Sequence, residues 1–308
     1  MSSTVNQFHA NGKLLLTGEY FILDGAVGLA LPTKFGQSLT VDSLTSSEGL
    51  EEKGITWESI DDKNNTWFEA NFNEALEIIS TTDNEIAATL KNILEHCKLR
   101  TQNSKLITKL DFPQNWGLGS SSTLISLLAQ YANIDPYELL AKTFGGSGYD
   151  IACATATQSI TYQKISNLKS QISNPVNFNP SFSNHLYFVH LNQKQNSREG
   201  IQHYKNLTLD KTEYIEQISN ITQKIILANE LDEFCYYMDV HENIVANVLN
   251  LPKVKDIYFS DFPGSIKSLG AWGGDFILVA SDEDALTINK YFVDKAFPTI
   301  LSYNEMIL

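Results

Sequence analysis

The sequence predicts an α+β fold, because segments typical of strands and segments typical of helices are mixed along the chain without strict alternation. At roughly 100–200 residues per domain, a chain of 308 residues suggests about two domains. Apolar residues make up 43% of the chain and charged residues 19%, which is enough apolar surface for a substantial core. We therefore expect two packed α+β layers in about two domains.

Strands are predicted where short apolar or β-branched runs are broken by Gly, Pro or Asp. The run 105–112 is the clearest example, because Leu106, Thr108 and Leu110 alternate with their neighbours and Pro113 ends the run. The strands predicted from such runs are 13–16, 28–31, 38–41, 66–72, 105–112, 185–191, 266–269 and 276–280.

Helices are predicted where apolar residues recur at a spacing of three and four. In 83–98 five apolar residues follow this spacing, and Asp83 stands at the N-cap position. The predicted helices are 83–98, 121–133, 136–142, 150–157, 210–228, 230–250 and 282–291. The segment 167–184 is rich in Asn, Ser and Pro without periodicity, so it is expected to connect two domains, 1–166 and 185–308.

The net charge of the chain argues against some classes of binding partner. The chain carries 22 Lys and Arg against 36 Asp and Glu, a net charge of −14, and its only arginines are Arg100 and Arg198. Nucleic acids and anionic membranes require clustered positive charge, so neither is an expected partner. Three widely spaced cysteines (Cys97, Cys153 and Cys235) argue against a disulfide framework. With no apolar stretch of 18 residues and no basic leader, the sequence favours a cytoplasmic protein.

The loop 113–123 reads Pro-Gln-Asn-Trp-Gly-Leu-Gly-Ser-Ser-Ser-Thr and lies between a predicted strand and a predicted helix. Its glycines allow successive N–H groups to turn toward an anion, and the start of the helix adds further N–H groups. Serine hydroxyls can donate to phosphate oxygens or bind Mg²⁺. Short Gly/Ser motifs also occur as simple turns with a serine N-cap, so the loop alone leaves both interpretations open.

Two more glycine turns are open to both a structural and a chemical interpretation. The turn 145–149 brings Asp150 to the start of a helix, where it can cap the helix or accept the proton of a substrate hydroxyl. The cluster 270–275 is either an ordinary turn or part of a binding site. Lys13 in a strand and Glu19 after Gly18 can likewise be structural.

Metal-dependent and triad-type hydrolysis have little support in the sequence. The six histidines show neither HxxxH nor HExxH spacing, and no GxSxG elbow occurs. The chain also lacks the Walker A pattern GxxxxGK[ST].

Four motifs are informative because of the order in which they occur along the chain. They are the run 11–23 (Asn-Gly-Lys-Leu-Leu-Leu-Thr-Gly-Glu-Tyr-Phe-Ile-Leu), the loop 117–121, the run 146–154 and the run 267–275. In this order, over most of the chain, they resemble the motifs of the GHMP kinase superfamily. The string 148–152 (Gly-Tyr-Asp-Ile-Ala) resembles the signature of the branch called GYDIA family GHMP kinases.

This resemblance implies an N-terminal domain like domain 2 of ribosomal protein S5 and a ferredoxin-like C-terminal domain, with ATP and a small acceptor meeting between them. It implies Mg²⁺ and ATP as cofactors, and catalytic roles for Lys13 as a charge-stabilising cation and Asp150 as a base or electrostatic partner. The phosphate-binding residues it implies are Gly117, Leu118, Gly119, Ser120, Ser121 and Ser122, with Ser121 the metal contact. The substrate-binding residues it implies are Glu19, Tyr20, Ser147, Gly148, Gly270, Ala271, Trp272 and Gly273.

The resemblance also bears on which acceptor molecule is phosphorylated. The string 18–20 (Gly-Glu-Tyr) is more similar to phosphomevalonate kinase than to mevalonate kinase, which usually has histidine at Tyr20, so a mevalonate-pathway acceptor is expected, with phosphomevalonate preferred. A kinase of homoserine or a sugar, and a silent nucleotide-binding protein, remain alternatives. The chain is expected to act as a monomer or homodimer. The cations available for an acceptor phosphate are Lys13, Lys109, Lys142, Lys267 and Arg198.

Three departures from the family pattern bear on the site. Leu139 stands at the spacing where mevalonate kinase carries a metal-binding glutamate, and Glu138 would point about 100° away on a helix. Trp272 stands where the third motif usually has glycine, so its ring is expected either to stack against substrate or to fill the cleft. Ser122 and Thr123 also replace the small alanines usual after the loop.

Overall fold

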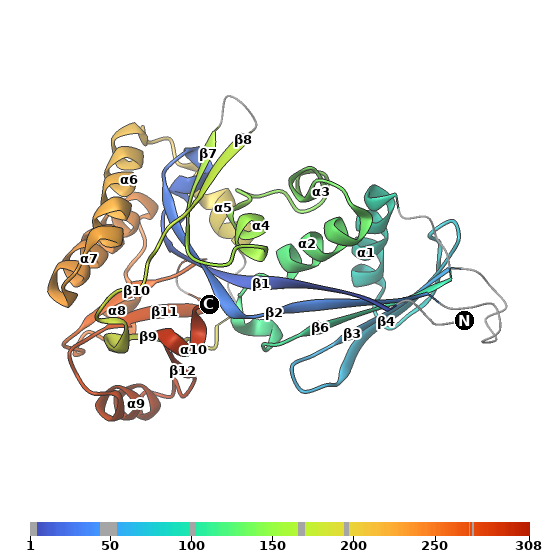
Figure 1. The fold of residues 1–308 in the computed structure, drawn as a ribbon. Helices are drawn as coiled ribbons and strands as arrows, with labels where there is room; N and C mark the ends of the chain where they lie inside the picture. The colour runs from blue at the N-terminus through green and yellow to red at the C-terminus, as the bar shows by residue number, and fades with distance from the viewer. Residues whose placement is uncertain are drawn as a thin grey trace. The chain divides into compact units, whose positions relative to one another are not determined.

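A computed structural model describes residues 5–43, 54–98, 103–165, 170–193, 197–270, 272 and 274–308 (Figure 1). The chain forms two compact units. The first unit consists of Met1–Gly12, Phe35–Gln114 and Gly119–Thr155, and the second of Lys13–Lys34, Asn115–Leu118 and Ala156–Leu308. These units are interleaved in sequence, whereas the domains 1–166 and 185–308 are consecutive, and that domain division stays a prediction.

The first unit contains a mixed sheet with the strand order β5-β4-β3-β6-β2. Its strands are β2 (Gly28–Ser43), β3 (Gly54–Ile60), β4 (Thr66–Asn73), β5 (Ile78–Thr81) and β6 (Ser104–Leu110), and β1 (Val5–Thr17) pairs with β2. Neighbouring strands on this path are antiparallel except for β3 and β6, which are parallel. Every second residue of β6 is buried, which confirms the alternation predicted for this strand.

Four helices of the first unit pack on its sheet. They are α1 (Asn84–Cys97), α2 (Ser120–Ala132), α3 (Pro136–Lys142) and α4 (Tyr149–Ala154), and the first three lie on one side of the strands in Figure 1. Apolar residues from the strands and these helices form one buried cluster. The Asp83 carboxylate accepts hydrogen bonds from the backbone N–H groups of Glu85 and Ile86, so the predicted N-cap of α1 is confirmed.

In the second unit, two strands that the sequence does not predict continue the sheet beyond β2. β7 (Ile160–Ile165) pairs with the first residues of β2 and with β8 (Ser170–Pro175). The segment 167–184, expected to connect two domains, therefore contains a strand at 170–175, which the sequence did not predict. β8 has mostly exposed side chains, so it lacks the apolar alternation that marks a strand, and its composition alone is that of a linker.

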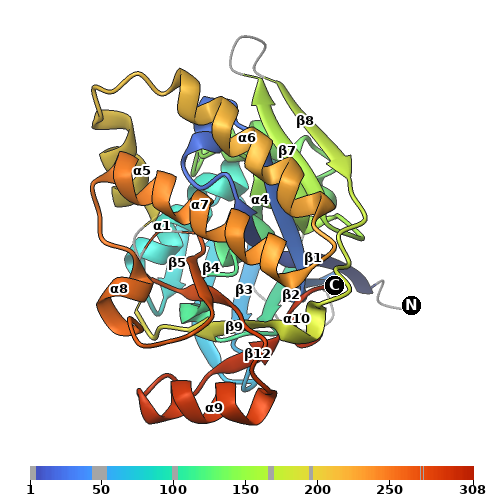
Figure 2. The same cartoon turned by 90° about the vertical axis from the view of Figure 1, so that its left-hand side faces the viewer.

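A four-stranded antiparallel sheet with the order β10-β11-β9-β12 forms the centre of the second unit. Its strands are β9 (Leu186–His190), β10 (Ser265–Ser268), β11 (Phe276–Ala280) and β12 (Ile300–Ser302). The helices are α5 (Ser197–Asn206), α6 (Thr212–Leu227), α7 (Leu231–Leu249), α8 (Val254–Tyr258), α9 (Ala285–Asp294) and α10 (Tyr303–Met306). Figure 2 shows α6 and α7 side by side, and α7 also contacts β10.

The turn that follows β1 is held by α6. The hydroxyls of Thr17 and Thr222 lie 2.7 Å apart, and the Thr17 hydroxyl accepts the N–H of Leu29 at 2.9 Å. The Thr222 hydroxyl also lies 2.9 Å from the carbonyl oxygen of Val27. These contacts fix the end of β1 and the beginning of β2 inside the second unit. Among the residues that the structure describes, no helix is long and apolar enough to span a membrane.

Candidate active site

Lys13 and the beginning of the Gly/Ser loop lie together in the second unit. The Lys13 Nζ donates to the carbonyl oxygen of Gly117 at 2.8 Å, and the Lys13 backbone N–H donates to the carbonyl oxygen of Leu118 at 3.0 Å. Gly117 has a φ of +67°, a conformation that glycine adopts without strain. The predicted catalytic lysine and the predicted phosphate-binding loop, which are 104 residues apart, are therefore joined directly.

The same loop segment is anchored on the four-stranded sheet. The carbonyl oxygen of Asn115 lies 3.0 Å from Nε2 of His190 on β9, and the Trp116 ring stands edge-on to Phe276 of β11. A Cβ atom on Gly117 would lie 2.2 Å from the Oδ2 atom of Asp275, so the loop approaches this carboxylate as closely as a glycine allows. Sequence reasoning gave no role to His190 or to the Asp275 side chain.

The second half of the loop begins α2 in the first unit. Gly119 is the N-cap with a φ of +94°, and the Ser122 hydroxyl donates to its carbonyl oxygen at 2.8 Å. Ser122 is buried, whereas Ser120 is half-buried and Ser121 is exposed at the first turn. A helix N-terminus offers unpaired N–H groups and a positive dipole end to an anion. Of the three predicted serines, Ser120 and Ser121 are therefore the ones whose positions suit phosphate or Mg²⁺.

Asp150 lies in the first turn of α4, which packs against α2 within the first unit. Three glycines before it (Gly145, Gly146 and Gly148) have φ values of +67°, +116° and +90°. Ser147 and Asp150 are half-buried and Gly148 is buried, and the Asp150 Oδ1 accepts the N–H of Ile151 at 3.1 Å. The glycine turn thus brings the predicted base to the start of a helix.

The residues at the usual glutamate position do not form a metal site. Leu139 is buried in the core of the first unit, and Glu138 is exposed near Lys142, with 3.8 Å between charged atoms. Over the described part of the chain, no three His, Cys, Asp or Glu side chains are grouped so that they could hold a metal ion. Mg²⁺ binds with few protein ligands when phosphates supply the others, and hydroxyls such as that of Ser121 fit this chemistry.

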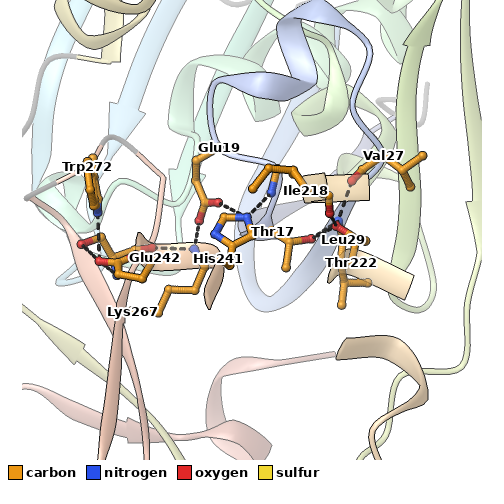
Figure 3. Close-up of polar contacts among 12 residues, drawn as sticks. Thr17, Glu19, Val27, Leu29, Ile218, Thr222, His241, Glu242, Lys267 and Trp272 are labelled. Atoms are coloured by element: carbon orange, nitrogen blue, oxygen red, sulfur yellow. Dashed lines mark hydrogen bonds and ion pairs between the residues drawn. The ribbon is translucent and has the colours of Figure 1, made fainter. Parts of the chain in front are cut away.

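A buried polar cluster in the second unit contains Glu19, Tyr20 and Trp272, which are predicted to bind substrate. Figure 3 labels Glu19 and Trp272 together with the residues that contact them. Glu19 is 2% exposed and forms an ion pair with Lys267 of β10, which is 1% exposed and also donates to the carbonyl oxygen of Ser268 at 2.9 Å. Burial raises the pKa of Glu19 to about 7, although the Lys267 ammonium opposes the rise. Lys267 is therefore occupied by Glu19 and is not a surface cation.

Two adjacent residues of α7 complete this cluster. The His241 Nε2 accepts the N–H of Gly18 at 3.0 Å. The Glu242 Oε1 accepts three hydrogen bonds: from the Ser268 N–H at 3.1 Å, the Ser268 hydroxyl at 2.8 Å and the Trp272 indole at 3.1 Å. Burial lowers the pKa of His241 well below its usual range and raises the pKa of Glu242.

Tyr20 and Trp272 meet in the same cluster. The Trp272 backbone N–H donates to the Tyr20 hydroxyl at 3.2 Å, and the Tyr20 ring stacks on Tyr204 with centroids 5.7 Å apart. Tyr20 has a φ of +63°, which is uncommon for a bulky residue, and Gly270 has a φ of +68°. Trp272 thus fills the interior beside Tyr20. Ala271 and Gly273, also predicted to bind substrate, lie outside the described residues.

Sequence reasoning missed His241 and Glu242 and misjudged Lys267, although one signal was present. Lys267 stands in a predicted strand between apolar and small residues, and every residue of β10 is buried. A lysine inside a buried strand requires a carboxylate partner.

No family model matches the sequence, and no curated protein matches it. Solved structures do match. Mevalonate kinase from L. major, in complex with R-mevalonate, aligns with a TM-score of 0.69 at 14% identity, over 98% of this chain and 96% of that chain. Phosphomevalonate kinase from Streptococcus pneumoniae, in complex with phosphomevalonate and AMPPNP, aligns with a TM-score of 0.69 at 15% identity, over 96% and 99%. Galactokinase from Lactococcus lactis, complexed with galactose, aligns with a TM-score of 0.66 at 14% identity, over 97% and 92%.

These alignments extend over nearly the whole of each chain and define a two-domain α+β fold shared with small-molecule kinases. This chain shares the two-domain α+β fold of these kinases, which is the fold that the resemblance to the GHMP kinase superfamily implies. The fold class expected from the sequence is confirmed.

Proposed function

We propose that this protein is a Mg-ATP-dependent kinase that transfers the γ-phosphoryl group of ATP to a hydroxylated acceptor of the mevalonate pathway, with phosphomevalonate preferred over mevalonate. The observation that carries the proposal is the bond from the Lys13 ammonium to the carbonyl oxygen of Gly117, at the beginning of a Gly/Ser loop that leads into a helix. A lysine and a helix N-terminus on one loop suit the binding of phosphate groups.

In this mechanism each residue has a limited task, because phosphoryl transfer depends mainly on positioning and charge stabilisation. The Lys13 ammonium stabilises the negative charge on the transferred group. Ser120, Ser121 and the N–H groups at the start of α2 bind phosphate oxygens, and the Ser121 hydroxyl holds Mg²⁺. When bound, Mg²⁺ neutralises phosphate charge. The Asp150 carboxylate orients the acceptor hydroxyl and accepts its proton.

The preference for phosphomevalonate is supported by the Gly18-Glu19-Tyr20 string, which is more similar to phosphomevalonate kinase than to mevalonate kinase. Lys267 is buried and paired with Glu19, so it is not proposed to bind an acceptor phosphate. A kinase for homoserine or a sugar is the alternative within the same fold, and the galactokinase neighbour makes a sugar acceptor worth testing.

The proposal is tested by ADP release with Mg-ATP and, side by side, phosphomevalonate, mevalonate, homoserine and galactose. Phosphomevalonate should give the highest kcat/KM. Lys13→Met should lower kcat by at least a hundredfold, while Lys105→Met, which removes a lysine of β6 that pairs with Glu58, should leave kcat within about twofold. Near-normal turnover in Lys13→Met would contradict the role of this lysine. A rise in Tm with ATP and no turnover on any acceptor would instead favour a silent nucleotide-binding protein.

A further inference from the structure

The buried cluster connects two turns that are far apart in the sequence. We name residues 18–20 the first turn, and Ser268, Gly270 and Trp272 the second turn. We propose that Glu242 and Lys267 are positioning residues that bind these two turns to one another, so that the segments that hold the acceptor move as one rigid element. The statement about the acceptor rests on the proposed function, whereas the coupling of the two turns does not.

The first connection runs through Lys267. Its ammonium pairs with the Glu19 carboxylate in the first turn and donates to the carbonyl oxygen of Ser268 in the second turn. Because one cation contacts both turns while it is 1% exposed, neither turn can move without breaking a buried contact of this lysine. A buried ion pair is costly to break, since the remaining charge is left without a partner.

The second connection runs through α7. His241 accepts the Gly18 N–H, and its neighbour Glu242 accepts three donors from the second turn. Adjacent residues of one helix therefore hold one turn each. The bond from the Trp272 N–H to the Tyr20 hydroxyl closes the ring of contacts directly between the turns.

These buried charged and polar groups lower the stability of the folded state more than an apolar core would. Two carboxylates face one ammonium and a histidine whose pKa is lowered, and Glu19 Oε2, His241 Nδ1 and Glu242 Oε2 are buried without a hydrogen-bond partner in the described structure. Unpartnered buried polar atoms cost stability, and apolar residues of similar volume would cost less. The first turn also keeps Tyr20 at a φ of +63°. Such costs are concentrated where a fixed geometry serves function, which favours a positioning role over simple packing.

The test uses Trp272→Phe, which keeps an aromatic ring and removes one donor to Glu242. The matched control is Trp57→Phe in the first unit, because the Trp57 indole is also buried and donates to the Ser59 hydroxyl at 2.9 Å. Hydrogen exchange of the full-length protein is followed in peptides that cover each turn. Trp272→Phe should speed exchange in both turns about tenfold or more, and Trp57→Phe should change neither. Faster exchange in the second turn alone would overturn the coupling.

Steady-state kinetics gives the readout that mere structural support would not move. Glu242→Leu should raise the acceptor KM about tenfold, with the ATP KM and kcat within about twofold. Glu242→Gln keeps an accepting oxygen and should stay within about threefold of the wild-type acceptor KM, whereas Glu242→Leu should not. An equal effect on both KM values, or no rescue by glutamine, would overturn the positioning role. If wild-type protein releases no ADP with any acceptor, the proposed function fails and the exchange result alone decides the coupling.

Discussion

Replacing Glu19 by glutamine should remove a large part of the pH dependence of the stability of this fold. Burial raises the pKa of Glu19 from 4.5 to about 7, so between these pH values the native state holds a proton that the unfolded chain releases. The free energy of unfolding therefore falls as the pH rises through this range, and the full cost is present above pH 7. Glutamine keeps the shape of the side chain and has no such proton.

The expected size follows from the same shift. A tenfold change in a protonation equilibrium is worth about 1.4 kcal/mol, so raising the pKa from 4.5 to about 7 corresponds to about 3 kcal/mol. Glu242 has a raised pKa and acts in the same direction. The pKa of His241 is lowered, so it acts in the opposite direction below about pH 6.5. Both residues are present in wild type and variant, so the difference between the two proteins reports the removal of the Glu19 carboxyl together with its effect on these two neighbours.

The assay is urea unfolding of both proteins at pH 5, 6, 7 and 8. Relative to wild type, Glu19→Gln should gain about 2–3 kcal/mol on going from pH 5 to pH 8. Glu58→Gln is the control, because Glu58 pairs with Lys105 near the surface and its pKa is lowered. A lowered carboxyl pKa changes stability only below its usual range, so this control should be flat between pH 5 and pH 8. Parallel curves for wild type and Glu19→Gln would refute the raised pKa.

Three substitutions test other parts of the structure. Gly117→Ala places a Cβ atom 2.2 Å from Asp275 Oδ2 at a φ of +67°, so the Kd for ATP, measured by calorimetry, should rise at least tenfold. Gly200→Ala places a Cβ atom 2.4 Å from the Tyr20 hydroxyl and should cost about 1–3 kcal/mol in urea unfolding, although alanine favours helices; a stabilised variant would contradict the packing of Tyr20. Asp83→Ala should cost about 1 kcal/mol by the same measurement, because α1 loses its N-cap, and no loss would show that the cap is dispensable.

Elements with strong local signals could be predicted from the sequence. The helix expected at 136–142 is α3 with the same bounds, since proline begins it and Asp135 caps it. The strand expected at 276–280 is β11, because an unbroken apolar run marks a strand buried on both faces. In contrast, the strands expected at 28–31 and 38–41 are parts of one strand, β2, which continues through Pro32. The helix α5 could not be predicted from the sequence, because it has few apolar residues.

The candidate site likewise contains residues that could be predicted from the sequence and contacts that could not. The glycine turns before Asp150 and at Gly117 could be found, because glycine at positive φ leaves a signature in the sequence. The partner of Glu19 could not be found, because Lys267 is 248 residues away and no local pattern records such a contact. The close approach of Gly117 to Asp275, the residue before β11, has the same character, because the two residues are far apart in the sequence.

The long separation of these contacts affects how the protein is made. At roughly 5–20 residues per second, Glu19 leaves the ribosome about 12–50 s before Lys267, which lies 248 residues later in the chain. Gly18 is likewise synthesised before its partner His241, and Thr17 before its partner Thr222. Until then, the apolar end of β1 has no helix from the second unit to cover it. Newly synthesised chains therefore pass through a period in which this strand depends on chaperones or on dilution to avoid aggregation.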